Sequence, residues 1–362
     1  MSEIWAKSSG RGSGTPIRLS EHIKDVLEAF EELKGYVRNS QLGELIKLAI
    51  VCHDLGKVSP AFQTQAMKNN SYEPSYPYHN VPHSLFSVLW IDRDKLREHI
   101  RNSEQEQEDY LRFVLSAVAY HHWREDFVEL LGSYTELGDL CRELESKGHI
   151  KQLEKNLIKE IEQLDGDWQT LIGFNNEMAK GLQNGVPFVE YARPPYQLYW
   201  LPKRIEIEDR KLREWVLISG FLMRSDHFAS FCEEEGEKYK PEDQNVSLNV
   251  IKQNVKSRIE EKAKTIDAKS IWQLEKLEQP EDLRDKNVVL VAPTGYGKTE
   301  FAFLWSSSEK FFYTLPLRAA VNQIFERAKQ IFQDQSDDEK VGLLHSDADI
   351  YLLGDGGEAQ VS

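Results

Sequence analysis

The sequence lacks the features that mark a membrane, secreted or disulfide-rich protein. Its 362 residues hold no run of about 18 apolar side chains, the length that a membrane-spanning helix needs. The N-terminus lacks the charged and then apolar order of a secretory signal, which predicts a cytoplasmic protein. The cysteines are odd in number and fall outside any CxxC spacing, so we expect reduced thiols and neither disulfides nor a zinc ribbon. They are Cys52, Cys141 and Cys232.

Basic residues are also few relative to acidic ones. Lysine and arginine number 45 against 60 aspartates and glutamates, a formal net charge of −15. This charge repels nucleic acid at long range, so a nucleic-acid site would have to be a local basic or metal-bearing groove. The composition, 40% hydrophobic and 29% charged, is that of a globular protein with room for about two domains.

The chain changes character twice along its length. Residues 1–232 show long apolar stripes at helical spacing and almost no alternation, which predicts an all-α domain. The charged stretch that follows contains glycine and proline and predicts a linker over residues 233–247. Residues 248–362 begin with helical segments and reach "VVLVA", a Gly-rich turn and a helix, the opening of an α/β domain.

Several apolar helical stripes of the first domain continue into histidine or aspartate. In "LSEHIKDVLEAFEEL", His22 lies on the face of Val26 and Phe30. In "LIKLAIVCHDLGK", the stripe runs through His53, with Asp54 beside it. The same reading applies to "VPHSLFSVLWI", "YLRFVLSAVAYHHW" and "LREWVLISGFLMRSDHF". The metal-capable side chains predicted to point inward are His22, His53, Asp54, His83, His121, His122 and Asp226.

Taken singly, each of these residues has a simpler explanation. A lone histidine on an apolar face is most often a core residue bonded to a carbonyl, which is our interpretation of the remaining candidates. These are His79, His99, His149 and His227. An inward carboxylate such as Asp226 needs a cation or several donors, and a buried arginine could supply them. For the whole set, a divalent metal is the simplest common partner, and mixed nitrogen and oxygen ligands suit Mn, Fe, Co or Ni as well as Zn.

The ordered pattern H…HD…H…HH…D resembles the HD phosphohydrolase superfamily. The spelling "HDLGKVSPAFQ", with "WAKS" near the start and "YHH" later, resembles the HD nuclease domain of the CRISPR-associated helicase-nucleases of type I systems, over residues 4–232. The resemblance implies an all-α HD-type helical domain with two metal sites. It places one metal on His22, His53, Asp54 and Asp226, and a second on His83, His121 and His122 with Asp54 shared. Relatives often carry Glu where this chain has Ser84, which would loosen the support of His83.

The same resemblance implies how the site would act. Asp54 would bridge the metals and Lys57 would orient a phosphate, so both are predicted catalytic residues; a solvated surface role is the alternative for Lys57. Two divalent ions (Mn, Co, Ni, Fe or Mg) about 4 Å apart can activate water and stabilise the attacking and leaving oxygens of a phosphodiester. The histidines must be neutral to bind metal, so activity should fall on acidification.

The segment "APTGYGKT", Ala292 to Thr299, fits a phosphate-binding loop. Backbone N–H groups and a helix N-terminus cradle phosphates in such loops, the lysine neutralises them and the hydroxyl reaches Mg²⁺. We therefore predict that ATP with Mg²⁺ binds at Gly295, Gly297, Lys298 and Thr299.

With "YTLPLRAAVNQ" downstream, this loop resembles motifs I and Ia of superfamily 2 helicases. The resemblance implies that Arg318 and Gln323 contact the backbone of a single DNA strand, and Gln273 could read adenine. The sequence ends before a DEAD or DEAH box or a second RecA-like lobe. We therefore expect a partial α/β RecA-like (P-loop) domain that binds ATP weakly, without DNA-stimulated hydrolysis, and DNA cleavage that needs no ATP.

Three functions agree with these patterns. The favoured one is a metal-dependent single-stranded DNA endo- or exonuclease of CRISPR interference, joined to an ATP-binding helicase fragment. Its partners would be single-stranded DNA and the RNA-guided CRISPR surveillance complex. A nucleotide phosphohydrolase of the HD superfamily explains the metal site but leaves the helicase motifs without a purpose. The third possibility is a non-catalytic remnant that binds ATP or DNA.

Overall fold

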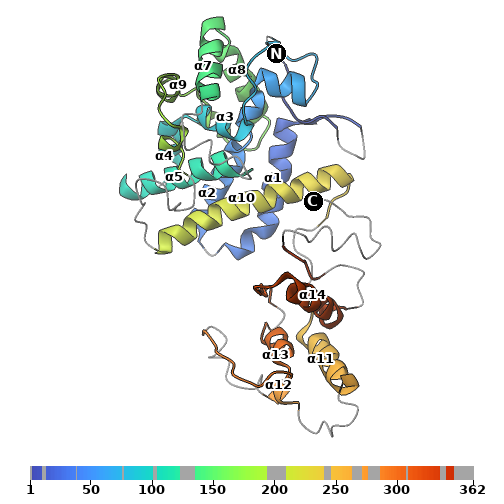
Figure 1. The fold of residues 1–362 in the computed structure, drawn as a ribbon. Helices are drawn as coiled ribbons and strands as arrows, with labels where there is room; N and C mark the ends of the chain where they lie inside the picture. Colours follow the sequence, from blue (N-terminus) through green and yellow to red (C-terminus); the bar gives the residue numbers. More distant parts are fainter. Residues whose placement is uncertain are drawn as a thin grey trace. The chain divides into compact units, whose positions relative to one another are not determined.

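The computed structural model divides the chain into two compact units, Met1–Glu242 and Asp243–Ser362, which we treat separately (Figure 1). No helix within the described segments combines the length and apolar character needed to cross a bilayer. The structure describes residues 2–9, 14–37, 39–75, 77–100, 104–122, 135–193, 209–239, 246–262, 271–275, 286–306, 309–334 and 340–345.

Four helices form the centre of the first unit. They are α1 (Leu19–Leu33), α2 (Ser40–Cys52), α5 (Glu104–Tyr120) and α10 (Asp209–Glu235). In α1 the buried residues recur every three or four positions, as the sequence predicts. Asn39 caps the N-terminus of α2, where its side chain accepts a hydrogen bond from the Gln41 N–H. The long helix α10 contacts α1, α2 and α5, and in Figure 1 it crosses α1 and α2. One continuous apolar core joins all four helices.

Shorter elements surround this centre. The strands β1 (Trp5–Lys7) and β2 (Ile17–Arg18) pair antiparallel. The other helices among the described residues of this unit are α3 (His83–Leu89), α4 (Arg93–His99), α7 (Thr135–Lys147), α8 (Ile150–Ile161) and α9 (Asn176–Gln183). Short helical turns are η1 (Lys34–Tyr36), η2 (Leu55–Val58), η3 (Phe62–Ala66), η4 (Trp168–Leu171) and η5 (Phe188–Glu190). The described part of residues 1–232 is thus mainly helical, with one short pair of strands, consistent with an HD-type domain.

The end of α10 differs from the predicted domain boundary. The helix continues to Glu235, so the first residues of the predicted 233–247 linker are helical. The charged sequence "CEEEGEK" suggests solvent exposure, yet the side chain of Glu233 is only 4% exposed. Sequence charge is a poor guide here because the tertiary structure provides this carboxylate with partners.

The second unit is described only in part. Its helices are α11 (Leu248–Lys262), α12 (Trp272–Glu275), α13 (Lys298–Trp305) and α14 (Arg318–Phe332). A small apolar core lies between α11, α13 and α14 and includes Ile251, Phe303 and Ile331.

The predicted strand "VVLVA" does not form a paired strand. No strand occurs among the residues described in the second unit, and Val289 and Val291 are 88% and 89% exposed. The α/β prediction for this unit is therefore not seen directly. A β-branched run gains its stability from hydrogen bonds and side-chain contacts with neighbouring strands, which the run itself does not supply.

Candidate metal centre

Five helical segments of the first unit deliver the predicted ligands to one place. His22 lies on α1, His53 and Asp54 follow α2, His83 opens α3, His121 and His122 follow α5, and Asp226 lies on α10. His22, His53, Asp54, His121 and Asp226 are buried, His83 is partly buried and His122 is exposed. The cluster thus reaches from the core to the surface at His122.

Asp54 lies at the middle of this cluster. Its Oδ1 is 3.2 Å from His83 Nε2 and 3.6 Å from His121 Nε2. Its Oδ2 is 3.4 Å from His22 Nε2 and 3.3 Å from His53 Nε2. The two oxygens of one carboxylate therefore face two different pairs of histidines.

Asp226 and His122 complete the two halves. Asp226 Oδ1 lies 3.2 Å from His22 Nε2 and 3.8 Å from His53 Nε2, although His22 and Asp226 are far apart in the sequence. On the other side, His122 joins Asp54, His83 and His121 in a group whose potential ligand atoms all lie within 4.8 Å of one another. The two halves contain the residues of the two implied ligand sets, and His53, His121 and Asp226 form a further group across them. The division into two metal sites stays a prediction.

Backbone contacts orient two of the histidines. His53 Nδ1 lies 2.6 Å from the Ile50 carbonyl oxygen, and His121 Nδ1 lies 2.7 Å from that of Val118. A carbonyl oxygen only accepts, so Nδ1 carries the proton in each ring. The lone pair of a neutral ring is then on Nε2, the atom that faces the carboxylates. This is the tautomer that binds a metal through Nε2.

The chemistry of the buried atoms fits divalent metal. Within the described part of the chain, five of these buried atoms have neither a hydrogen bond nor a lysine partner: Nε2 of His22, His53, His83 and His121, and Oδ1 of Asp54. Two ligands of one ion, each about 2.1 Å from it, are separated by about 3.0 to 3.4 Å. Four of the six histidine-to-carboxylate distances given above lie between 3.2 and 3.4 Å. Ion-binding geometry thus accounts for contacts that hydrogen bonds do not.

The charges of the clustered side chains set one another's protonation. Burial disfavours the charged form of Asp54, but the neighbouring His53 and Lys57 hold its pKa well below the usual range. Burial also lowers the pKa of His22, but contacts with Asp226, Asp54 and Glu233 outweigh it and raise that pKa to about 10. His83 is dominated by burial, which lowers its pKa to about 4. The carboxylates are therefore ionised, as metal ligands must be.

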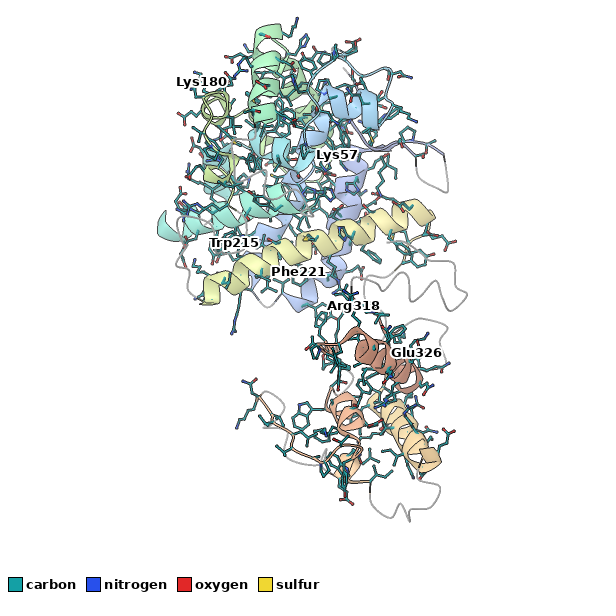
Figure 2. All side chains as sticks on the ribbon, viewed as in Figure 1. Lys57, Lys180, Trp215, Phe221, Arg318 and Glu326 are labelled. Carbon is teal, nitrogen blue, oxygen red and sulfur yellow. The ribbon has the colours of Figure 1, made fainter. Side chains whose placement is uncertain are left out.

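Lys57 is buried, which contradicts the solvated-surface alternative. Its Nζ lies 2.6 Å from Asp54 Oδ2, and the residue is only 7% exposed (Lys57 is labelled in Figure 2). The lysine balances part of the negative charge of the centre, because an unpaired buried carboxylate would be costly.

Gly56 and Ser87, which the sequence patterns did not single out as site residues, fix the turn that carries Asp54. A Cβ atom at Gly56 would lie 1.9 Å from the His83 carbonyl oxygen, so only glycine allows α3 to come this close. The Gly56 N–H donates to Ser87 Oγ at 2.8 Å, and Ser87 Oγ lies 2.7 Å from the His53 carbonyl oxygen. Ser84, the noted departure from relatives, is buried on the same helix.

The interpretation of the other histidines as core residues was wrong. His79, His99 and His227 are exposed and His149 is only partly buried. His79 pairs with Glu143, and His149 contacts the Tyr78 hydroxyl. His227 belongs to a group with His122 and Asp226 at the edge of the metal centre. Helical spacing misplaced His227 because neighbours of an inward residue on a helix can lie at the boundary between core and solvent.

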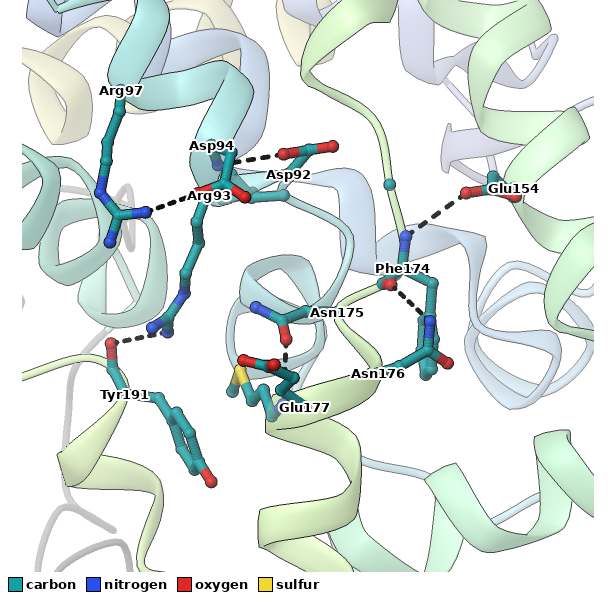
Figure 3. Close-up of a pocket in the computed structure, with 13 residues that line it drawn as sticks. Asp92, Arg93, Asp94, Arg97, Glu154, Phe174, Asn175, Asn176, Glu177 and Tyr191 are labelled. Carbon is teal, nitrogen blue, oxygen red and sulfur yellow. Dashed lines mark hydrogen bonds and ion pairs between the residues drawn. The ribbon is translucent and has the colours of Figure 1, made fainter.

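A separate cavity of about 550 Å³ lies at α4 and the start of α9 (Figure 3). Its polar groups are bonded to one another: Arg93 Nη2 donates to the Tyr191 carbonyl oxygen, Arg97 pairs with Asp94, and Glu154 accepts from the Phe174 N–H. None of the predicted metal ligands lines it. We assign no chemistry to this cavity.

Two glycines of the predicted phosphate-binding loop adopt the left-handed backbone conformation that glycine favours. Gly295 and Gly297 have φ angles of +84° and +76°, and Gly297 immediately precedes α13. Lys298 Nζ donates to the carbonyl oxygens of Ala292 and Pro293 at 2.8 and 3.0 Å, and Thr299 is partly buried. The lysine therefore folds over its own loop.

Three further residues predicted in the second unit take different positions. Arg318 opens α14 and is exposed, as is Gln323 on the same helix (Arg318 is labelled in Figure 2). Gln273, considered for adenine recognition, is only 5% exposed, and its Nε2 donates to the Tyr296 carbonyl oxygen at 3.0 Å. In this structure Gln273 supports the loop backbone.

Comparison with known families identifies the first unit. Residues 5–232, more than half of the chain, match the family model described as "Cas3, HD domain". The chain belongs to the Cas3 HD domain family. The family implies a hydrolase that acts on phosphodiester bonds, with a divalent metal at the histidine and aspartate cluster.

The Cas3 resemblance extends into the second unit. Residues 273–351 match the DEAD/DEAH box helicase family, which implies a RecA-like part that uses ATP with Mg²⁺. The CRISPR-associated nuclease/helicase Cas3 of Methanothermobacter thermautotrophicus is 24% identical over 383 residues, a match that covers 92% of this chain. The chain spans only 41% of that relative's length. No solved structure matches the chain.

Proposed function

We propose that this chain is a metal-dependent nuclease that cleaves single-stranded DNA in CRISPR interference and carries an ATP-binding helicase part. The single observation that supports it best is the Asp54 carboxylate, whose two oxygens face two separate pairs of histidine Nε2 atoms without hydrogen-bond partners. A carboxylate placed in this way is suited to bridge two cations.

The proposed ligand sets follow the two halves of the cluster. The first is His22, His53, Asp54 and Asp226, and the second is Asp54, His83, His121 and His122. Two divalent ions, among Mn, Co, Ni, Fe and Mg, would supply the Lewis acidity and water activation that phosphodiester hydrolysis needs. In this scheme water is the nucleophile, so no side-chain nucleophile is needed.

The chain's own residues position the substrate and balance charge. Asp54 sets the distance between the two ligand sets, because its Oδ2 faces His53 of the first set and its Oδ1 faces His83 of the second. The buried ammonium group of Lys57 pairs with the same carboxylate. From this position it can also donate a hydrogen bond to one oxygen of a phosphodiester. His122 and His227 lie exposed beside the buried ligands, so we place the entry of the DNA strand on their side.

We propose that the second unit binds ATP with Mg²⁺ through Gly295, Gly297, Lys298 and Thr299, and a single DNA strand through Arg318 and Gln323. The left-handed glycines ahead of α13 and the exposure of both α14 residues support these roles. In this proposal residues 1–232, with the last turn of α10, form the nuclease domain. The rest of 233–247 is the linker, and 248–362 belongs to the RecA-like domain.

The partners are proposed from the relative's name and from the resemblance of the motifs. The Methanothermobacter protein is described as a CRISPR-associated nuclease/helicase. By analogy, we propose that the chain acts in the cytoplasm on DNA delivered by the RNA-guided CRISPR surveillance complex.

The purified chain provides the test. It should be given single-stranded DNA, duplex DNA and nucleoside triphosphates, each with Mn²⁺, Co²⁺, Ni²⁺ or Mg²⁺, beside Asp54→Ala as a control. We expect metal-dependent cleavage of single-stranded DNA that the control lacks. Release of phosphate from nucleotides without DNA cleavage would identify a phosphohydrolase instead. If the chain shows neither DNA cleavage nor phosphate release, a non-catalytic binding protein is favoured.

A further inference from the structure

One ligand of the metal centre has a partner that the family pattern does not assign. His22 Nδ1 lies 2.7 Å from Glu233 Oε1, and the Glu233 side chain is only 4% exposed. The other oxygen of this carboxylate pairs with the ammonium group of Lys7. An ionised carboxylate only accepts, so His22 Nδ1 donates. In the neutral ring, which is the form that binds a metal, Nε2 then carries the lone pair, and this atom faces Asp54 and Asp226.

Glu233 is itself held by the N-terminal strand. Lys7 Nζ lies 2.9 Å from Glu233 Oε2 and donates to the Ser230 carbonyl oxygen at 3.0 Å. Lys7 ends β1 and is the lysine of the "WAKS" segment. The lysine thus contacts α10 twice, at a backbone carbonyl oxygen and at the carboxylate that contacts His22.

The other end of β1 is tied to the opposite side of the centre. The Trp5 N–H donates to Gln63 Oε1 at 3.0 Å, and Gln63 Nε2 donates to the Trp5 carbonyl oxygen at 2.9 Å. The same Nε2 lies 2.7 Å from the carbonyl oxygen of Lys57, and Gln63 is fully buried. The strand therefore connects the segment that carries Asp54 and Lys57 with the helix that carries Asp226.

We propose that Glu233 and Lys7 are positioning residues of the metal centre: Glu233 orients His22 so that Nε2 faces the ion, and Lys7 fixes Glu233. The proposal rests on the proposed metal site. A carboxylate that accepts from the distal nitrogen of a ligating histidine fixes the ring and makes the other nitrogen a better donor. Loss of such a partner typically weakens metal binding by about 10- to 100-fold.

A purely architectural role makes a different prediction. If the Lys7–Glu233 pair only joins β1 to α10, its loss should lower the stability of the first unit and leave metal affinity unchanged in protein that remains folded. Glu214 offers a matched control, because it is another buried glutamate on α10. It accepts from the Tyr110 hydroxyl and pairs with Arg210, and none of the predicted ligands contacts it.

The test measures Mn²⁺ affinity of the full chain by titration calorimetry and, in parallel, the metal-free melting temperature. We expect Glu233→Ala to weaken the site that contains His22 by about 10- to 100-fold. Glu233→Gln should recover part of this loss, since its amide oxygen still accepts from His22 Nδ1. Lys7→Ala should have a smaller effect, and Glu214→Ala should lower the melting temperature with unchanged Mn²⁺ affinity.

The outcomes separate this proposal from the proposed function. Wild-type Mn²⁺ affinity in folded Glu233→Ala overturns the positioning role while leaving the metal centre in place. If Glu233→Ala does not fold, Glu233→Gln decides: the proposal requires a reduced affinity in that variant, and an unchanged one overturns it. A wild-type chain that binds no divalent metal overturns both this proposal and the proposed nuclease.

Discussion

The two units arrange their proposed binding residues in opposite ways. The proposed metal ligands of the first unit come from five separate helical segments and meet in a cluster that is buried except at His83 and His122. The predicted phosphate-binding loop of the second unit is one continuous stretch and is largely exposed. Its shape depends on Gly295 and Gly297 and on the start of α13. The first site exists only when the whole unit is folded, whereas the second is a local structure.

This contrast has an energetic basis. Gathering Asp54, Asp226 and Glu233 away from water is costly unless cations and donors meet them, and the large core around α1, α2, α5 and α10 makes such a cluster tolerable. Lys298 remains exposed and satisfies its donors with the loop's own carbonyl groups. Mutations at the two sites should therefore differ in how strongly they change activity or binding and in how much of the unit they affect.

The largest effect is expected from Asp54→Ala. This change removes both oxygens that face the histidine pairs, and we expect cleavage of single-stranded DNA to fall by roughly 10³-fold or more, since groups that act as a unit fail together. The helical content should persist because α2 and its apolar neighbours are unchanged. Cleavage assays with circular dichroism check both points. Activity near that of the wild type would contradict the bridging role.

A second prediction concerns Lys298→Ala in the other unit. Loss of the charged donor should weaken ATP binding by about 10- to 100-fold, since a hydrogen bond to a charged group contributes about 1.5 to 3 kcal/mol. Metal-dependent DNA cleavage should be unchanged and independent of ATP. Fluorescent-nucleotide binding and cleavage assays on the same preparation measure the two effects. Parallel loss of both would show that the units are not independent.

Metal addition should stabilise the two units unequally. At 100 times its Kd, Mn²⁺ should raise the free energy of unfolding of the first unit by about 2.7 kcal/mol, because it binds only the folded cluster. Hydrogen exchange followed by mass spectrometry should show slower exchange in α2 and α10, with α11 unaffected. Asp54→Ala provides the control and should lose the protection. Equal protection of both units would refute a metal site specific to the first.

The smallest effect is expected from Asp25→Asn, on the α1 face near Glu233. Burial, with the charges of Glu233 and Glu28, raises the pKa of Asp25 to about 6. The folded chain therefore binds this proton more tightly than the unfolded chain, and stability falls as pH rises from about 4 through about 6. Asparagine removes that penalty.

At pH 7.5 the variant should be more stable by about 1 kcal/mol, a value reduced for solvent screening at this half-buried site. The gain should vanish at pH 4, where Asp25 is largely protonated in the folded chain. Urea unfolding at the two pH values measures it, with the exposed Asp165→Asn as a control. A gain that is equal at both pH values would point to a cause other than the charge.

Much of the metal centre was predictable because helical periodicity is a local property. The spacing of His22 with Val26 and Phe30, and the run of apolar residues into His53, indicated the inward direction that the structure has. The glycine pattern of "APTGYGKT" likewise indicated a loop before a helix, and the structure has that loop. The catalytic, metal-binding and nucleotide-binding roles of these residues remain predictions.

Only the tertiary structure decided the contacts between distant segments. Sequence pattern could not separate Glu233 from the acidic residues beside it, because its burial depends on Lys7 and His22 lying next to that turn of α10. It also could not show that each Asp54 oxygen faces its own histidine pair. The run Val288–Val291 looks like a strand but is unpaired among the described residues. A helix face follows from spacing within one segment, whereas a strand pair or a buried charge needs a partner from elsewhere in the chain.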